Sequence, residues 1–189
     1  MNYENSVTLS GLLHHLSRKK DDKHFAFSIR HENLFNGSTR KDFLNARAFP
    51  ADVQEKLKSL DENTPIKVKG SLRTSSGSGE LYLAVSELEV LPEKFELENS
   101  VKLSGDVHQV KAQAEGETGT GKYIRFAVRQ ENVDAQGHSK RDFIVIRVYD
   151  ENLRGILAGK NDGDPVEAEG TLRSSRGSGV NYVRAVSIK

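Results

Sequence analysis

Apolar and polar residues alternate along several short stretches of the first ninety residues. Residues 7–11, 25–30 and 43–49 each place apolar side chains at every second position. This period of two is typical of β-strands that bury one face. Two further strands are predicted over residues 66–72 and 81–85, joined by a short segment rich in Ser and Gly. The pattern therefore predicts five strands.

One segment between the third and fourth strands has a longer apolar period. Val53, Leu57 and Leu60 are four and three residues apart, which predicts one short helix over residues 51–60. Asn36-Gly37 is a turn signal between the second and third strands. Five strands with a helix between the third and fourth are the pattern of the OB-fold, a Greek-key barrel. The predicted fold class is therefore all-β.

The second half of the chain repeats the first half. Residues 6–11 recur as residues 100–105, and nine of eighteen positions are identical between residues 65–82 and 165–182. The offset between matching positions grows from 94 to 100, so the second copy has longer loops, chiefly around residues 112–121. Such ordered matches indicate an internal duplication.

The duplication predicts two tandem OB domains in one chain. Residues 1–91 form the first domain and residues 100–189 the second. Residues 92–99 form a short acidic linker that begins with Pro92, so the two domains are expected to lie close together.

The third strand of each copy carries an unusual row of side chains. Its alternate positions are apolar in both copies and are predicted to face the barrel interior: Leu44, Ala46, Ala48, Ile144, Ile146 and Val148. The opposite positions carry an aromatic residue, an Arg and a second aromatic residue: Phe43, Arg47 and Phe49, then Phe143, Arg147 and Tyr149. Two rings about 20 Å apart with a cation between them suit single-stranded nucleic acid, because bases stack on the rings and Arg meets phosphate.

Further arginines are expected to extend this candidate nucleic-acid-binding surface. They are Arg30 and Arg129 on the second strands, and Arg73 and Arg173 before the last hairpins. Two other interpretations stay open: Phe49 and Tyr149 cover a barrel end, or the third-strand aromatics fill the interface between the copies. Tyr82 and Tyr182 are interpreted as structural.

These segments resemble the bacterial single-stranded DNA-binding proteins of the SSB type, over nearly the whole of both copies. The matching segments read NSVTLSG, RKDFLNARAF, KRDFIVIRVY and VKGSLRTSSGSGELYLAVSELEVL. The resemblance implies that the third-strand aromatics, Phe43, Phe49, Phe143 and Tyr149, stack on DNA bases. It also implies four OB barrels per assembly, which a homodimer of this chain would supply, and replication or repair proteins as partners. The chain departs from the family pattern in its short hairpin loop and in having no Trp.

Composition narrows the class of protein further. Lys and Arg total 28 against 27 Asp and Glu, so the net charge of +1 excludes a globally basic nucleic-acid binder. The absence of Cys excludes disulfides, Cys-ligated zinc and a Cys nucleophile. No apolar run approaches the roughly 18–20 residues of a membrane helix, and the N-terminus does not resemble a signal peptide. We expect a cytoplasmic, nucleoid-associated protein.

No other motif indicates catalysis. His14, His15, His24 and His31 lie in one copy, and only His14 has a counterpart, His108. We interpret them as partly exposed strand residues, and expect no metal, no cofactor and no enzyme activity. The predicted function is sequence-tolerant single-stranded DNA binding in replication, recombination or repair. The alternatives are a primosome-like OB accessory protein that mainly binds other proteins, and a single-stranded RNA binder.

Overall fold

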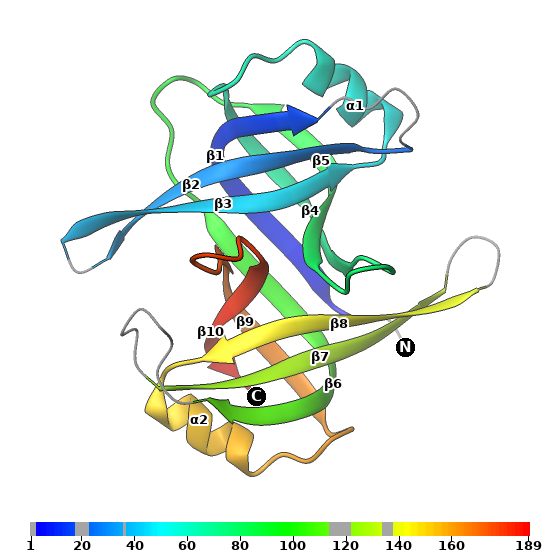
Figure 1. Ribbon diagram of the computed structural model, residues 1–189, viewed down its shortest axis with the longest axis vertical. Coiled ribbons are helices and arrows are strands. Elements are labelled where there is room, and N and C mark those ends of the chain that lie inside the picture. Colours follow the sequence, from blue (N-terminus) through cyan, green and yellow to red (C-terminus); the bar gives the residue numbers. More distant parts are fainter. Residues whose placement is uncertain (1–2, 18–22, 36, 114–121, 134–137) are drawn as a thin grey trace.

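The computed structural model describes residues 3–17, 23–35, 37–113, 122–133 and 138–189 (Figure 1). The first copy contains β1 (Asn5–Ser17), β2 (Phe25–Phe35), β3 (Ser38–Ala48), α1 (Ala51–Lys58), β4 (Pro65–Thr74) and β5 (Leu81–Val90). The second contains β6 (Asn99–Gln113), β7 (Tyr123–Val133), β8 (Ser139–Val148), α2 (Glu151–Ala158), β9 (Pro165–Ser174) and β10 (Asn181–Ile188). The predicted turn residue Asn36 lies outside the described residues.

The strands of each copy close into a barrel. β1 pairs with both β2 and β4, β2 pairs with β3, and β3 runs parallel to β5, which returns to β4. β6 to β10 repeat these pairings in the same order. This connectivity is the five-stranded Greek-key barrel of the OB-fold, so the predicted fold class is confirmed for both copies.

The alternation of the third strand sets which side chains fill the barrels. Leu44, Ala46 and Ala48 are buried, as are their counterparts in the second copy. The predicted interior face is therefore confirmed. α1 packs Val53 and Leu57 against the core of the first barrel, and ends at Lys58 instead of residue 60. Among the described residues, no helix is long and apolar enough to cross a membrane.

Strands β1 and β6 join the two barrels by pairing antiparallel with each other. Val7 is paired with Val101, which is its own counterpart in the duplication. Asn5 pairs with Leu103 and Leu9 with Asn99, so the register is symmetric about this valine pair. The two copies are therefore related by an approximate two-fold axis that passes between Val7 and Val101. We call it the internal dyad (Figure 1).

The acidic segment between the barrels is fixed to β1. The carbonyl oxygen of Glu98 accepts a 2.8 Å hydrogen bond from the Ser10 amide, and the Ser10 hydroxyl donates to Glu96 at 3.0 Å. Lys67 Nζ lies 2.5 Å from the Glu98 carboxylate. These contacts hold the two barrels close together. The domain limits at residues 91 and 100 stay a prediction.

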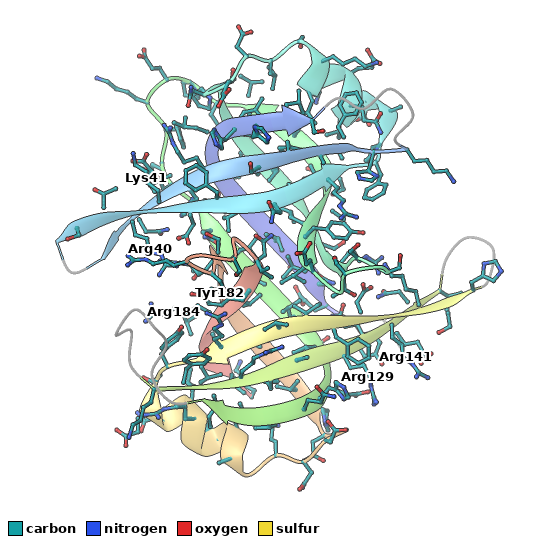
Figure 2. All side chains as sticks on the ribbon, viewed as in Figure 1. Arg40, Lys41, Arg129, Arg141, Tyr182 and Arg184 are labelled. Atoms are coloured by element: carbon teal, nitrogen blue, oxygen red, sulfur yellow. The ribbon has the colours of Figure 1, made fainter. Side chains whose placement is uncertain are left out.

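A buried aspartate of β3 reaches across the dyad. The Asp42 side chain has no exposed surface and accepts hydrogen bonds from the amide and the hydroxyl of Ser174, at 3.0 and 3.1 Å. Arg173 Nε lies 3.0 Å from the same carboxylate. Arg40 completes the contact, because its guanidinium donates to both Asp42 and the Ser174 carbonyl (Figure 2). β3 is thereby bound to the β9–β10 hairpin of the other copy.

The dyad repeats this contact on β8. Asp142 is fully buried and accepts hydrogen bonds from the amide and the hydroxyl of Thr74, at 2.8 and 2.9 Å. Arg73 donates to Asp142 at 2.8 Å, and Lys140 donates to the Thr74 carbonyl at 2.9 Å. We call the two contacts together the cross-barrel network. Charge-assisted hydrogen bonds of this kind are short and strong.

Candidate nucleic-acid interface

The outward face of β3 exposes two phenylalanine rings. Phe43 retains 41% of its surface and Phe49 retains 44%, whereas Leu44 and Ala48 are buried. Arg47 lies between the two rings on the same face. For Phe43 and Phe49, the interpretation that these aromatics fill the interface between the copies is therefore wrong, because both rings are exposed.

Each exposed ring of β3 has a histidine beside it. The centres of the His14 and Phe43 rings are 4.9 Å apart, and those of His24 and Phe49 are 5.2 Å apart. Both pairs are tilted, at 51° and 35°. Such contacts hold a ring in place while leaving its other face open.

The second barrel repeats both ring pairs. The His108 and Phe143 rings are 4.8 Å apart, and the Tyr123 and Tyr149 rings are 5.1 Å apart. Phe143 and Tyr149 are half-buried, so this copy presents less of its aromatic surface. The guanidinium of Arg184, from β10, lies 4.9 Å from the Tyr149 ring (Figure 2).

A tyrosine from the last strand supports the arginine between the rings. The Arg47 guanidinium carbon lies 4.0 Å from the centre of the Tyr82 ring, and that of Arg147 lies 3.9 Å from Tyr182. Both tyrosines are buried. Burial raises the pKa of the Tyr182 phenol above its ordinary value, and the nearby Tyr149 adds to this rise. The tyrosines therefore position the arginines by cation–π contact.

These contacts define two equivalent surfaces. The first platform consists of His14, His24, Phe43, Arg47, Phe49 and Tyr82. The second platform consists of His108, Tyr123, Phe143, Arg147, Tyr149 and Tyr182. Each has rings at both ends and a stacked guanidinium between them, which is an arrangement that binds unpaired bases and their phosphates.

The other predicted arginines divide into two groups. Arg30 and Arg129 lie directly opposite Phe43 and Phe143 on the neighbouring strand, and each forms an ion pair with a carboxylate of its own barrel. They border the platforms.

Arg73 and Arg173 belong to the cross-barrel network. Arg173 is buried against Asp42, and Arg73 donates to Asp142. We therefore leave both arginines out of the proposed interface.

One histidine differs from its sequence interpretation. His31 is buried, not partly exposed, and its Nδ1 lies 2.7 Å from the Ser10 carbonyl oxygen. Sequence analysis does not predict the ring contacts that involve His14, His24, Tyr82 and their counterparts. For His14, the sequence does contain a signal, because this histidine is repeated exactly as His108.

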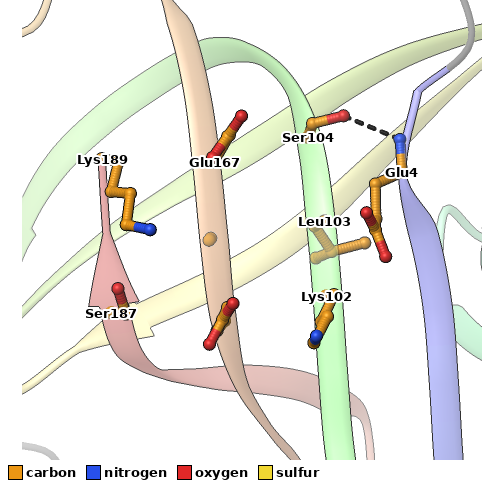
Figure 3. Close-up of a pocket in the computed structure, with 9 residues that line it drawn as sticks. Glu4, Lys102, Leu103, Ser104, Glu167, Ser187 and Lys189 are labelled. Atoms are coloured by element: carbon orange, nitrogen blue, oxygen red, sulfur yellow. Dashed lines mark hydrogen bonds between the residues drawn. The ribbon is translucent and has the colours of Figure 1, made fainter.

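A separate polar cavity lies beside β6 and β9 (Figure 3). It has a volume of about 320 Å³ and is lined by both signs of charge, including Glu4, Lys102, Glu167 and Lys189. The Glu4 amide donates a 2.7 Å hydrogen bond to the Ser104 hydroxyl at its edge. Mixed charges of this kind favour neither an anion nor a cation. Among the described residues, no group of three or more His, Asp or Glu side chains is placed to hold a metal ion.

Comparison with known proteins identifies the architecture. No family model matches the chain, and no curated protein matches its sequence. The structure is similar to a deletion mutant of the single-stranded DNA-binding protein from Thermus aquaticus, with a TM-score of 0.76. The chain has the fold of that protein. The two are 18% identical, and the match covers 99% of this chain and 94% of that one.

The wild-type Thermus aquaticus protein gives the same result. Its TM-score is 0.75 at 16% identity, with 100% of this chain and 93% of that chain covered. The resemblance to SSB-type proteins is thus confirmed as a resemblance of fold, with two OB barrels matched in one polypeptide. At these identities the likeness concerns the fold alone.

Proposed function

We propose that the chain binds single-stranded DNA without strong sequence preference, by stacking bases on the two platforms. The observation that carries the proposal is the exposed Phe43 and Phe49 with Arg47 stacked between them, repeated in register in the second barrel. A base stacked on an aromatic side chain contributes about 1–3 kcal/mol whatever its identity, because every base has a π-face. The likeness to a single-stranded DNA-binding protein supports this ligand.

Local charge supports the same ligand. The net charge is only +1, so general attraction to nucleic acid is weak. Arg47 and Arg147 nevertheless lie within the aromatic rows, where a cation meets the phosphates between stacked bases. We expect the protein to act on the bacterial nucleoid, in replication, recombination or repair.

Third-strand variants test the proposal. Phe43→Ala and Phe49→Ala should each weaken binding of a fluorescein-labelled oligo-dT by about 1–3 kcal/mol and leave the fold intact. Phe27→Ala is the matched control, because Phe27 lies in the core and its truncation should lower the free energy of unfolding by about 3–5 kcal/mol. Thermal unfolding and anisotropy titrations measure both quantities.

Two results would overturn the proposal. In the first, the wild-type protein binds oligo-dT no more tightly than duplex DNA of the same length. In the second, both third-strand variants bind as tightly as the wild type. Either result would favour the accessory protein that mainly binds other proteins. An oligo-rU titration decides between DNA and RNA, since stacking alone does not read the 2′-hydroxyl.

We also propose that two chains associate into a homodimer with four barrels. The proposal rests on the resemblance to SSB-type proteins, whose assemblies present four OB barrels, because each chain supplies two barrels. Sedimentation velocity tests this association: the mass of two chains would support the homodimer, and the mass of one chain at all concentrations would overturn it.

A further inference from the structure

His14 and His108 occupy the same position in the two barrels. Each follows a residue of β1 or β6 that faces the core, and each packs its ring beside the first aromatic residue of the third strand. Their side chains retain 34% and 24% of their surface. The duplication thus preserves a partly exposed imidazole next to Phe43 and Phe143.

The backbone after each histidine adopts the left-handed conformation that non-glycine residues avoid. His15 and Gln109 both have φ of +50°. In both barrels the strand register is interrupted directly after the histidine. Such strain costs roughly 1–3 kcal/mol, and a β-bulge re-aims the side chains around it. The strained bulge is present in both copies although its left-handed residue differs, His15 in one and Gln109 in the other. The feature that the two copies share is the position of the histidine before that residue.

A carboxylate lies within ion-pair distance of one ring nitrogen of each histidine. His14 Nδ1 lies 2.8 Å from Glu62, and His108 Nδ1 lies 3.3 Å from Asp162. Asp162 also accepts a 2.8 Å hydrogen bond from the amide of the strained Gln109. A carboxylate beside the buried Nδ1 leaves Nε2 as the nitrogen for a ligand.

The loops that carry these carboxylates are themselves tied to the strands. The Asn63 amide donates to the Leu13 carbonyl at 2.7 Å, and the Gly163 amide donates to the Val107 carbonyl at 2.8 Å. Asn63 and Gly163 both have positive φ. The loop after each helix is therefore held in the same way, and its carboxylate lies beside the histidine in both barrels.

We propose that His14 and His108 bind the phosphate backbone of single-stranded DNA through Nε2, beside the bases stacked on Phe43 and Phe143. This inference rests on the proposed function. A protonated imidazole donates from both nitrogens, so it bridges the protein carboxylate and a phosphate oxygen. Histidine changes its charge between about pH 5 and 8, so the contact should strengthen as pH falls through this range.

Other charged groups surround each imidazole. Around His14 these are Glu62 from the loop after α1, His15 from β1, and the Arg30–Glu32 pair on β2. Around His108 they are Asp162 from the loop after α2 and the Arg129–Asp106 pair between β7 and β6. Each arginine already has a carboxylate partner, and the charge that directly contacts each imidazole is negative.

The test replaces both histidines and measures binding at two pH values. His14→Phe with His108→Phe keeps a ring against Phe43 and Phe143 and removes the nitrogens. Anisotropy titration with an oligo-dT of about 32 nucleotides, the upper site size for two barrels, should show binding weakened by roughly tenfold at pH 6 and by less at pH 8. His138→Phe is the matched control, because His138 is exposed and belongs to neither platform.

The possible results separate this inference from the proposed function. If the wild type fails to bind oligo-dT, the proposed function itself is wrong. If the wild type binds and the double variant matches it at both pH values, the histidines do not contact the phosphates. The pair His14→Gln with His108→Gln repeats the measurement should the Phe pair fail to fold, and it should likewise flatten the pH profile. The His138→Phe control should keep the wild-type profile.

Discussion

Loss of the Asp142 carboxylate should destabilise the protein far more than loss of an exposed ion pair. Asp142 is fully buried and accepts hydrogen bonds from the Thr74 amide, the Thr74 hydroxyl and Arg73, all within 2.9 Å. Asp142→Ala leaves a buried amide without its acceptor and Arg73 without its charge partner. Breaking a buried pair in this way costs about 3–5 kcal/mol. Asp142→Asn keeps one acceptor oxygen and should cost about 1–3 kcal/mol.

Urea unfolding followed by far-ultraviolet circular dichroism measures these differences. The control is Glu87→Gln, whose carboxylate lies 3.5 Å from Lys69 in an exposed pair. That substitution should change the free energy of unfolding by less than about 1 kcal/mol. If Asp142→Ala shifts the unfolding midpoint no further than Glu87→Gln does, the cross-barrel network does not stabilise the fold.

Three further predictions concern acid, backbone packing and salt. Burial of Asp142 raises its pKa, but hydrogen bonds from Thr74 and Arg73 outweigh burial and hold the pKa below the ordinary value of 3.8. Its contribution is therefore present above that value and lost as pH falls through the lower folded pKa, so the stability difference between wild type and Asp142→Asn should shrink below about pH 4 in acid titrations. Gly70→Ala would place a Cβ 2.0 Å from the Ala84 carbonyl oxygen and should unfold at lower urea, whereas Gly77→Ala, with open space around it, should unfold at nearly the wild-type midpoint. Binding of oligo-dT should weaken with salt with a log–log slope of about −0.7 per phosphate contacted, and an affinity independent of salt would exclude the arginines as phosphate contacts.

The local structure of each barrel follows from the sequence because strand periodicity is a local property. Alternation alone places Leu44 inside and Phe43 outside, and the structure confirms both. The helix was predicted two residues too long because Leu60 matches the apolar spacing, although it packs on the core from beyond the helix end. Boundaries of this kind depend on capping, which periodicity does not report.

The contacts between the barrels did not follow from the sequence. Asp42 and Arg173 are far apart along the chain, and only the paired β1 and β6 strands bring them together. An arginine before a hairpin has the same local pattern whether it meets a phosphate or a buried carboxylate. The sequence does not indicate His14 as a metal ligand. Its repetition as His108 is nevertheless a sequence signal for a shared role.

The internal dyad relates two halves of one chain, so a substitution in one half need not occur in the other. In an assembly of identical chains every substitution appears on both sides of the axis. Here Asn181 exchanges hydrogen bonds with the backbone of Asn45, at 3.1 and 3.0 Å, while the mirrored positions hold Leu81 and Val145. The fused chain is therefore not symmetric at this junction: amide hydrogen bonds join the copies on one side of the dyad, and two apolar residues occupy the corresponding positions on the other side.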